Sequence, residues 1–171
     1  YGVSEVVAGY AVSMVFIGWV TGGPIIGYIS DRLGKRIAIV RIAMLLTAVL
    51  LTAVIYCNSM PIWALFILTF LVGVFSSAEL LNFSISIDVN PFFVKATALA
   101  FTNFVVSMAD LISQPLTGFL LELKWAGKMI DSAQVYAVSD YQSALSFLPV
   151  AIVVGVLISF TLRDQVRAEG Q

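Results

Sequence analysis

Apolar residues along the chain are gathered into five long runs that are separated by short polar connections. The first run, residues 6–29, has no charged residue, and as a helix rising about 1.5 Å per residue it would span about 36 Å, more than the roughly 30 Å core of a bilayer. The predicted spans are residues 6–29, 37–57, 62–87, 96–121 and 141–162, with a loop over 122–140 and a tail over 163–171. We therefore expect an all-α membrane protein with five transmembrane helices.

Few charged residues interrupt these runs. Arg41 lies one turn inside the second span, where its long side chain is expected to reach back to the lipid headgroups. Glu79 lies in the third span and Asp110 near the middle of the fourth, whereas the fifth span has no charge. An acid inside the membrane is costly and usually faces a water-filled cavity or a polar partner. These two acids are therefore the leading functional candidates.

Composition narrows the function classes. Hydrophobic residues make up 60% of the chain and charged residues 11%, which is far from the balance of a soluble domain. The net charge of −1 gives no support for a nucleic-acid partner. The chain has no histidine, which removes His-based catalysis and His-ligated zinc, and its single cysteine, Cys57, permits no internal disulfide. No cofactor or metal site is indicated.

Basic residues are distributed unequally between the two sides of the predicted bundle. One side would carry Arg32, Lys35, Arg36, Arg41, Lys95, Arg163 and Arg167, and the other only Lys124 and Lys128. Positively charged connections are retained in the cytoplasm. We therefore expect the chain to start outside, to expose the 122–140 loop externally and to end in the cytoplasm.

Small and aromatic residues are also placed as expected for membrane-spanning helices. Gly18 with Gly22, and Gly23 with Gly27, are each four residues apart and indicate close packing of the first span against another helix. Aromatic residues at the predicted outer ends would form an interfacial belt, and these are Tyr56, Trp63, Trp125, Tyr136 and Tyr141.

The connection between the first two spans carries the most specific motif. Its key positions are Gly27, Asp31, Arg32, Gly34, Lys35 and Arg36. Glycine at position 34 would allow a tight turn, and the basic residues would hold the loop inside. The plain alternative is a generic charged loop. However, the whole ten-residue pattern resembles the signature loop of the major facilitator superfamily, which joins helices 2 and 3 and recurs between helices 8 and 9.

The resemblance covers essentially the whole chain. Residues 95–104 and 114–121 resemble the start and end of helix 11 of that family. Glu79 stands where helix 4 usually has an arginine, and the chain stops shortly after the fifth span, which together favour helices 8 to 12. The resemblance then implies the carboxy-terminal part of a twelve-helix transporter, with the amino-terminal half and helix 7 outside this sequence.

Polar residues inside the spans share helix faces. Asn103, Ser107, Asp110 and Gln114 follow one another at spacings of 4, 3 and 4 on the fourth span. Glu79, Asn82 and Ser86 do so at 3 and 4 on the third, and Tyr10 and Ser13 form a weaker set on the first. The resemblance implies that these three spans line a central substrate site. Two structural alternatives stay open: Asp110 could bond a neighbouring helix, and Glu79 could pair with a base of the other half.

The function implied is secondary active transport of a small solute by alternating access, coupled to protons through Asp110, Glu79 or both. The expected partners are a small-molecule solute, protons, the lipid bilayer and the missing amino-terminal half, in a bacterial inner membrane. One alternative is a sensor or scaffold on the same fold that does not transport. Another is an intramembrane enzyme, although the sequence offers no nucleophile or metal set for it, so we expect no enzymatic activity.

Overall fold

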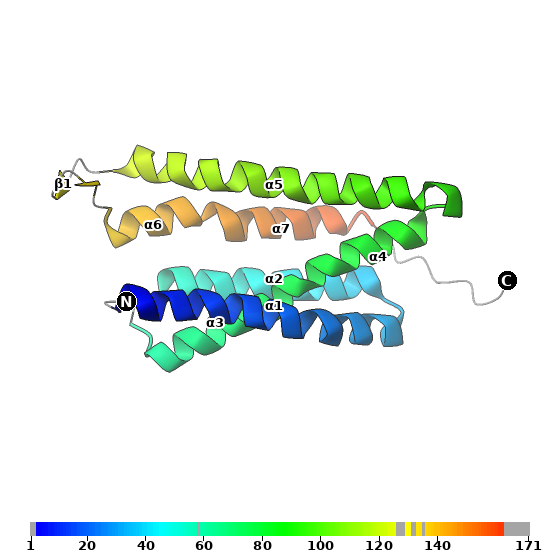
Figure 1. The fold of residues 1–171 in the computed structure, drawn as a ribbon, viewed down its shortest axis with the longest axis horizontal. Coiled ribbons are helices and arrows are strands. Elements are labelled where there is room, and N and C mark those ends of the chain that lie inside the picture. The colour runs from blue at the N-terminus through cyan, green and yellow to red at the C-terminus, as the bar shows by residue number, and fades with distance from the viewer. Residues whose placement is uncertain (1–2, 58, 126–128, 131–132, 135, 163–171) are drawn as a thin grey trace.

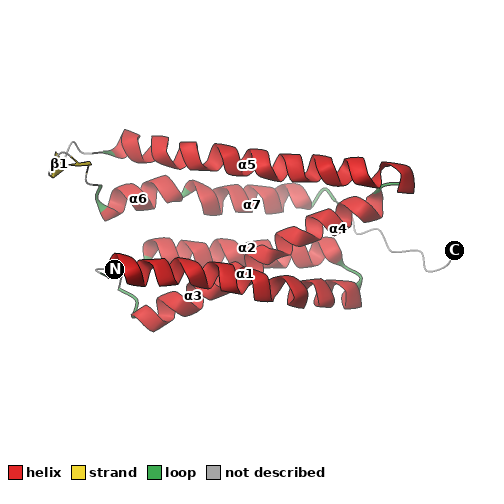
Figure 2. Cartoon of the chain, viewed as in Figure 1, coloured by secondary structure: helices red, strands yellow, loops and turns green. Residues whose placement is uncertain are grey.

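A computed structural model describes residues 3–57, 59–125, 129–130, 133–134 and 136–162. In these residues the chain runs back and forth along one long axis (Figure 1). Five helical stretches are long and apolar enough to cross a membrane, namely Glu5–Leu33, Arg36–Tyr56, Ile62–Val89, Phe92–Lys124 and Val138–Ser159. The expected all-α, five-helix architecture is confirmed (Figure 2). Two predictions fall outside the described residues. These are the cytoplasmic tail over 163–171 and the basic residue Lys128 of the external loop.

Local sequence explains where the first helices begin and end. Helix α1 (Glu5–Leu33) starts at Ser4, whose hydroxyl accepts a hydrogen bond from the backbone N–H of Val7. It ends at Gly34, which has a φ of 63° and donates its N–H to the carbonyl of Ser30. This left-handed conformation favours glycine because it has no Cβ. After one more residue, α2 (Arg36–Tyr56) returns antiparallel to α1.

The third span is interrupted near its middle, which the sequence pattern does not predict. Helix α3 (Ile62–Ser76) leads into a short 3₁₀ turn, η1 (Ser77–Glu79), before α4 (Leu80–Val89) continues the span. The hydroxyls of Ser76 and Ser77 donate to the carbonyls of Gly73 and Val74, three residues earlier. Serine bonded back to its own helix bends the helix locally, so Glu79 stands at a break in the span.

The fourth span is the longest helix, and a long connection joins it to the fifth span. A second 3₁₀ turn, η2 (Phe92–Val94), leads into α5 (Lys95–Lys124), the longest helix. The connection that follows holds a minimal antiparallel pair, β1 (Met129–Ile130) with β2 (Ala133–Gln134), within the loop that the sequence predicts over 122–140.

The fifth span is divided in two. Helices α6 (Val138–Leu145) and α7 (Phe147–Ser159) meet at Ser146. Proline at position 149 has no N–H to donate to the carbonyl four residues earlier. The loss of that backbone bond explains the interruption.

Packing divides the helices into a tight part and a loose part. Helix α1 packs against α3, and α2 packs against both α3 and α7. Their shared core consists of Ile26, Val40, Ala43, Ala78 and Leu81. Helix α5 contacts α4 near one end and α6 near the other, makes no direct contact with α1 among the described residues, and has no fully buried residue. Figure 1 shows α5 above α6 and α7, with α4 slanting up to meet it.

Small residues bring α1 and α3 very close together. A Cβ added at Gly22 would lie 2.6 Å from the carbonyl oxygen of Val74 and 2.7 Å from the hydroxyl of Ser77. One added at Gly18 would strike the backbone of Phe70, and one at Gly73 the backbone of Val15. Gly18 and Gly22 therefore pack as their spacing predicts. Gly23 touches only the side chain of Leu80, and Gly27 has open space around it.

Candidate functional site

The two intramembrane acids lie on separate spans. Glu79 ends the 3₁₀ turn in the third span, and Asp110 lies in the middle of α5. Both side chains are exposed, and the helix that follows Glu79, α4, packs against α5 near one end. Neither acid forms a salt bridge with a described basic residue. An ionised carboxylate inside a membrane is costly unless water or a partner satisfies it.

The polar stripe of α5 is open to its surroundings. Asn103, Ser107, Asp110 and Gln114 are all exposed, as are apolar residues of the same helix such as Phe104 and Leu111. Neighbouring hydroxyls on α5 behave differently. Ser113 donates to the carbonyl of Ala109, and Thr117 donates to that of Ser113. Among the described residues, the four side chains of the stripe form no bond of this kind.

A groove between α4 and α5 extends the set toward the end of the bundle that carries the signature loop. It measures about 380 Å³ and is lined by Ser86, Asn90, Val94, Thr97, Ala98, Phe101 and Thr102. We call it the inner groove. Ser86 thus belongs to it, and Asn82 is partly buried one turn before Ser86. A larger groove of about 530 Å³ lies between α2 and α7, but its walls are mostly apolar and include neither acid.

The candidate residues of α1 stand apart from this set. Tyr10 is 59% exposed, and Ser13 is exposed and donates to the carbonyl of Gly9 in its own helix. Since α1 and α5 make no direct contact among the described residues, the structure does not bring Tyr10 and Ser13 together with the stripe of α5.

The signature loop is organised by one arginine. The guanidinium of Arg36, the first residue of α2, lies 3.1 Å from Asp31 at the end of α1 and 2.9 Å from Asp88 at the end of α4. Arg32 instead lies near the hydroxyl of Tyr28, and Lys35 is exposed. Gly34 forms the turn, and Gly27 makes no close contact. The loop thus joins the ends of three helices.

Asp88 is a residue that the sequence analysis missed. Its signal was available, because it lies two residues before Asn90-Pro91, at the same end of the bundle as the signature loop. Asn90 was missed as well, although it continues the spacing of the α4 polar set by four residues after Ser86.

Arg41 is placed differently from the expected headgroup anchor. Its guanidinium donates to the hydroxyl of Ser159 (3.1 Å), to the carbonyl of Ser159 (2.5 Å) and to that of Leu162 (2.7 Å). It also lies 4.7 Å from the ring centre of Phe160. The last carbonyls of a helix have no partner within the helix, so Arg41 caps the end of α7. At the opposite end of α2, Tyr56 bonds Ser146 at 2.6 Å.

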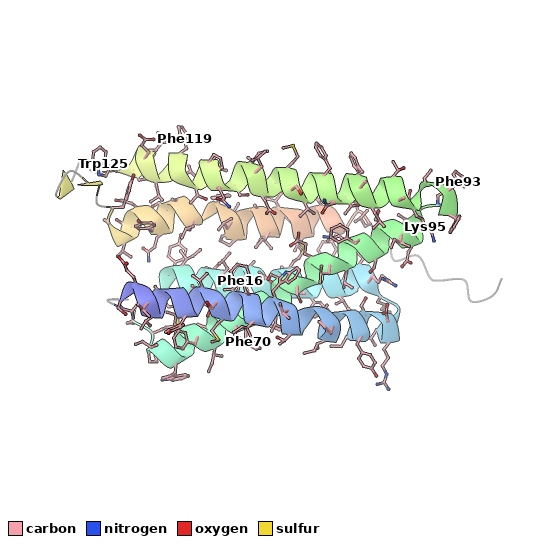
Figure 3. All side chains as sticks on the ribbon, viewed as in Figure 1. Phe16, Phe70, Phe93, Lys95, Phe119 and Trp125 are labelled. Atoms are coloured by element: carbon pink, nitrogen blue, oxygen red, sulfur yellow. The ribbon has the colours of Figure 1, made fainter. Side chains whose placement is uncertain are left out.

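The two ends of the bundle differ in character. Figure 3 places Lys95 and Phe93 at the signature-loop end and Trp125 at the other. Toward the Trp125 end, Tyr136 and Tyr141 pack edge to face, with ring centres 5.9 Å apart. Within the described residues, no group of three or more His, Cys, Asp or Glu side chains is placed to hold a metal ion.

These features define an integral membrane protein with two acids inside its spans and a basic loop between its first two helices. A family model for the Major Facilitator Superfamily matches residues 1–170, so the chain belongs to that superfamily. Comparison with curated proteins and with solved structures gave no match. The family is one of membrane transporters, and the resemblance inferred from the signature loop is confirmed.

Proposed function

We propose that the chain is the carboxy-terminal part, helices 8 to 12, of a transporter that moves a small solute by alternating access, driven by protons. Its membership of this superfamily of membrane transporters follows from the match over residues 1–170. The amino-terminal half of the same protein would then supply the other wall of the central cavity. Alternating access arises when two such halves rock about a site near the midplane.

One observation carries the proton coupling. Glu79 and Asp110 lie inside two spans whose helices α4 and α5 pack together, and neither forms a salt bridge with a described basic residue. A proton on either acid would remove the cost of a charge inside the membrane, and release of that proton would restore it. The free energy of the pair therefore depends on its protonation state, which is the property that a proton-coupled carrier needs.

The distribution of charge supports a cytoplasmic position for the signature loop. Among the described residues, five basic side chains lie toward that end, Arg32, Lys35, Arg36, Arg41 and Lys95, and Lys124 lies at the other. By the positive-inside rule, the first end would be cytoplasmic. The polar stripes would then connect a central site to the cytoplasm.

The test uses the full-length protein in liposomes that contain a pH-sensitive dye. Amino acids, sugars, nucleosides and organic cations are added one class at a time, with and without a pH gradient. We expect at least one class to be accumulated with movement of protons, and we expect Asp110→Asn and Glu79→Gln to uncouple the two fluxes. Ser113→Ala is the matched control, because the Ser113 hydroxyl only bonds its own helix.

Two results would contradict the proposal. Uptake by Asp110→Asn and Glu79→Gln that responds to the pH gradient as the wild type does would remove proton coupling. Binding of a solute without any uptake would instead favour a sensor on the transporter fold.

A further inference from the structure

The groove of about 530 Å³ between α2 and α7, which we call the α2–α7 groove, has polar side chains at one end. Tyr56 and Ser146 stand at the end that points away from the signature loop, and their hydroxyls bond each other at 2.6 Å. Thr52 also lines the groove, but its hydroxyl donates to the carbonyl of Ala48 in its own helix. The other lining residues are alanine, valine and proline. The groove therefore suits a molecule with a long apolar part and a polar group at one end.

The length of the groove matches half of a membrane. Its lining on α2 runs from Ala48 to Tyr56, the last residue of that helix. Eight residues at about 1.5 Å each give about 12 Å, close to half of the roughly 30 Å hydrocarbon core. The groove thus reaches from one end of α2 to about the middle of the span, which is the depth of the acyl chains of one leaflet.

The groove opens away from the core of the bundle. Ala43 and Thr47 lie on the buried face of α2, which packs against α1, α3 and α4. At about 100° per residue, Val49 and Tyr56 lie about 200° and 180° round the helix from Thr47. On the opposite wall, Val150 is 60% exposed, and Val49 is 66% exposed. The open side of the groove is therefore the side on which a membrane-spanning bundle meets lipid.

Hydrogen bonds near both ends of the groove hold its two walls at a fixed spacing. At one end, the side-chain amide of Gln142 in α6 donates to the carbonyl of Ile55 in α2 at 3.0 Å, beside the hydroxyl pair. Toward the other end of the helices, Arg41 of α2 donates to the hydroxyl of Ser159 in α7 at 3.1 Å. Between these bonds the small residue Ala48 is buried and lines the groove. Walls that are already held in place lose little conformational freedom when a ligand binds.

We propose that the α2–α7 groove binds one acyl chain of a phospholipid from the leaflet at the Trp125 end, with the headgroup of that lipid beside Tyr56. Phospholipid is the occupant that fits both the apolar walls and the polar end, and the open side of the groove faces the phase that contains it. Lipid tails are as apolar as the valine walls, so the preference for the groove comes from packing against two helices at once. The inference is independent of transport and of proton coupling, because it uses neither acid.

Photolabelling in liposomes tests the site. The full-length protein is reconstituted in phosphatidylcholine that includes a phosphatidylcholine with a diazirine in one acyl chain. It is then purified in a mild detergent, which removes loosely held lipid, and irradiated, and the labelled residues are identified by mass spectrometry. We expect label on Val150 and Val154 but not on Leu157 and Ile158, which are also exposed on α7 but do not line the groove. Equal labelling of both pairs would indicate an unspecific lipid shell and would overturn the proposal.

Filling the groove should displace the lipid. Val150→Phe places a ring between the walls, and we expect it to lower the label about tenfold, which corresponds to about 1.4 kcal/mol. Ile158→Phe is the matched control, because it makes a similar change at an exposed position of the same helix outside the groove. Val49→Phe on the other wall repeats the measurement if helical circular dichroism shows that Val150→Phe does not fold. Wild-type labelling of both groove variants would overturn the proposal.

Other occupants would give different results. In a protein otherwise free of cysteine, Val150→Cys would form a disulfide-linked dimer if the groove were an interface between two copies, and the wild type would then take up no label. Free fatty acid that displaced the probe as well as unlabelled phosphatidylcholine does would show that the headgroup contributes nothing. Either result would overturn the assignment to a phospholipid.

Discussion

Substitution of Gly73 by alanine tests the close packing of α1 and α3. The added Cβ would lie 2.8 Å from the carbonyl carbon of Val15 and 2.9 Å from the backbone nitrogen of Trp19, and closer still to the carbonyl oxygen of Val15. All three are backbone atoms of α1, so no rotamer change relieves the clash and the helices must move apart. Overpacking of this kind costs about 1–3 kcal/mol.

A favourable effect opposes this cost. Alanine in place of glycine in a helix stabilises it by about 0.5–1 kcal/mol. The net expectation for Gly73→Ala is therefore a loss of about 1–2 kcal/mol. For 150–250 residues, 1 kcal/mol corresponds to about 2–4 °C in the melting temperature, and the shift is smaller in a longer protein, so we expect a decrease of a few degrees at most.

The assay is thermal unfolding of the purified full-length protein in one detergent, followed by the loss of helical circular dichroism. Gly9→Ala is the matched control, because a Cβ at Gly9 on α1 meets nothing within 4 Å. It should keep or slightly raise the melting temperature. If Gly73→Ala melted at or above the wild-type temperature while Gly9→Ala was unchanged, the close contact between α1 and α3 would be wrong.

Three further predictions use the same unfolding assay. Ser30 is fully buried and its hydroxyl has no partner, so Ser30→Ala should raise stability by about 1 kcal/mol because it removes an unsatisfied polar group; a lower melting temperature would mean that the hydroxyl is bonded. Arg41→Lys keeps the charge but loses the fork that binds Ser159 and Leu162, so it should melt several degrees lower, whereas a headgroup anchor would tolerate lysine. Arg36→Gln removes both ion pairs of the signature loop and should lower the melting temperature more than Asp88→Asn, which removes one; equal effects would indicate that the pair with Asp31 contributes nothing.

The sequence alone determined the number of spans and the family. Long apolar runs can be recognised without knowledge of tertiary contacts. Every backbone group inside a membrane must be hydrogen-bonded, and this requirement makes each run a helix. The signature loop could be recognised for a similar reason, because its glycine turn and its basic residues act within a few positions of one another. The left-handed Gly34 that ends α1 follows from this local sequence.

Only the tertiary structure decided which residues meet across the chain. Arg41 caps a helix end 118 residues away, and Arg36 pairs with Asp88 on another span. Neither contact follows from helical periodicity, which relates positions within one helix only. The break at Ser77–Glu79 depends on hydroxyls that bond back to their own helix, a choice among several that serine can make. Likewise, spacing placed Asp110 and Glu79 on polar faces, but it could not give the orientation of one helix relative to the other, because crossing angles and rotations depend on side-chain packing between helices.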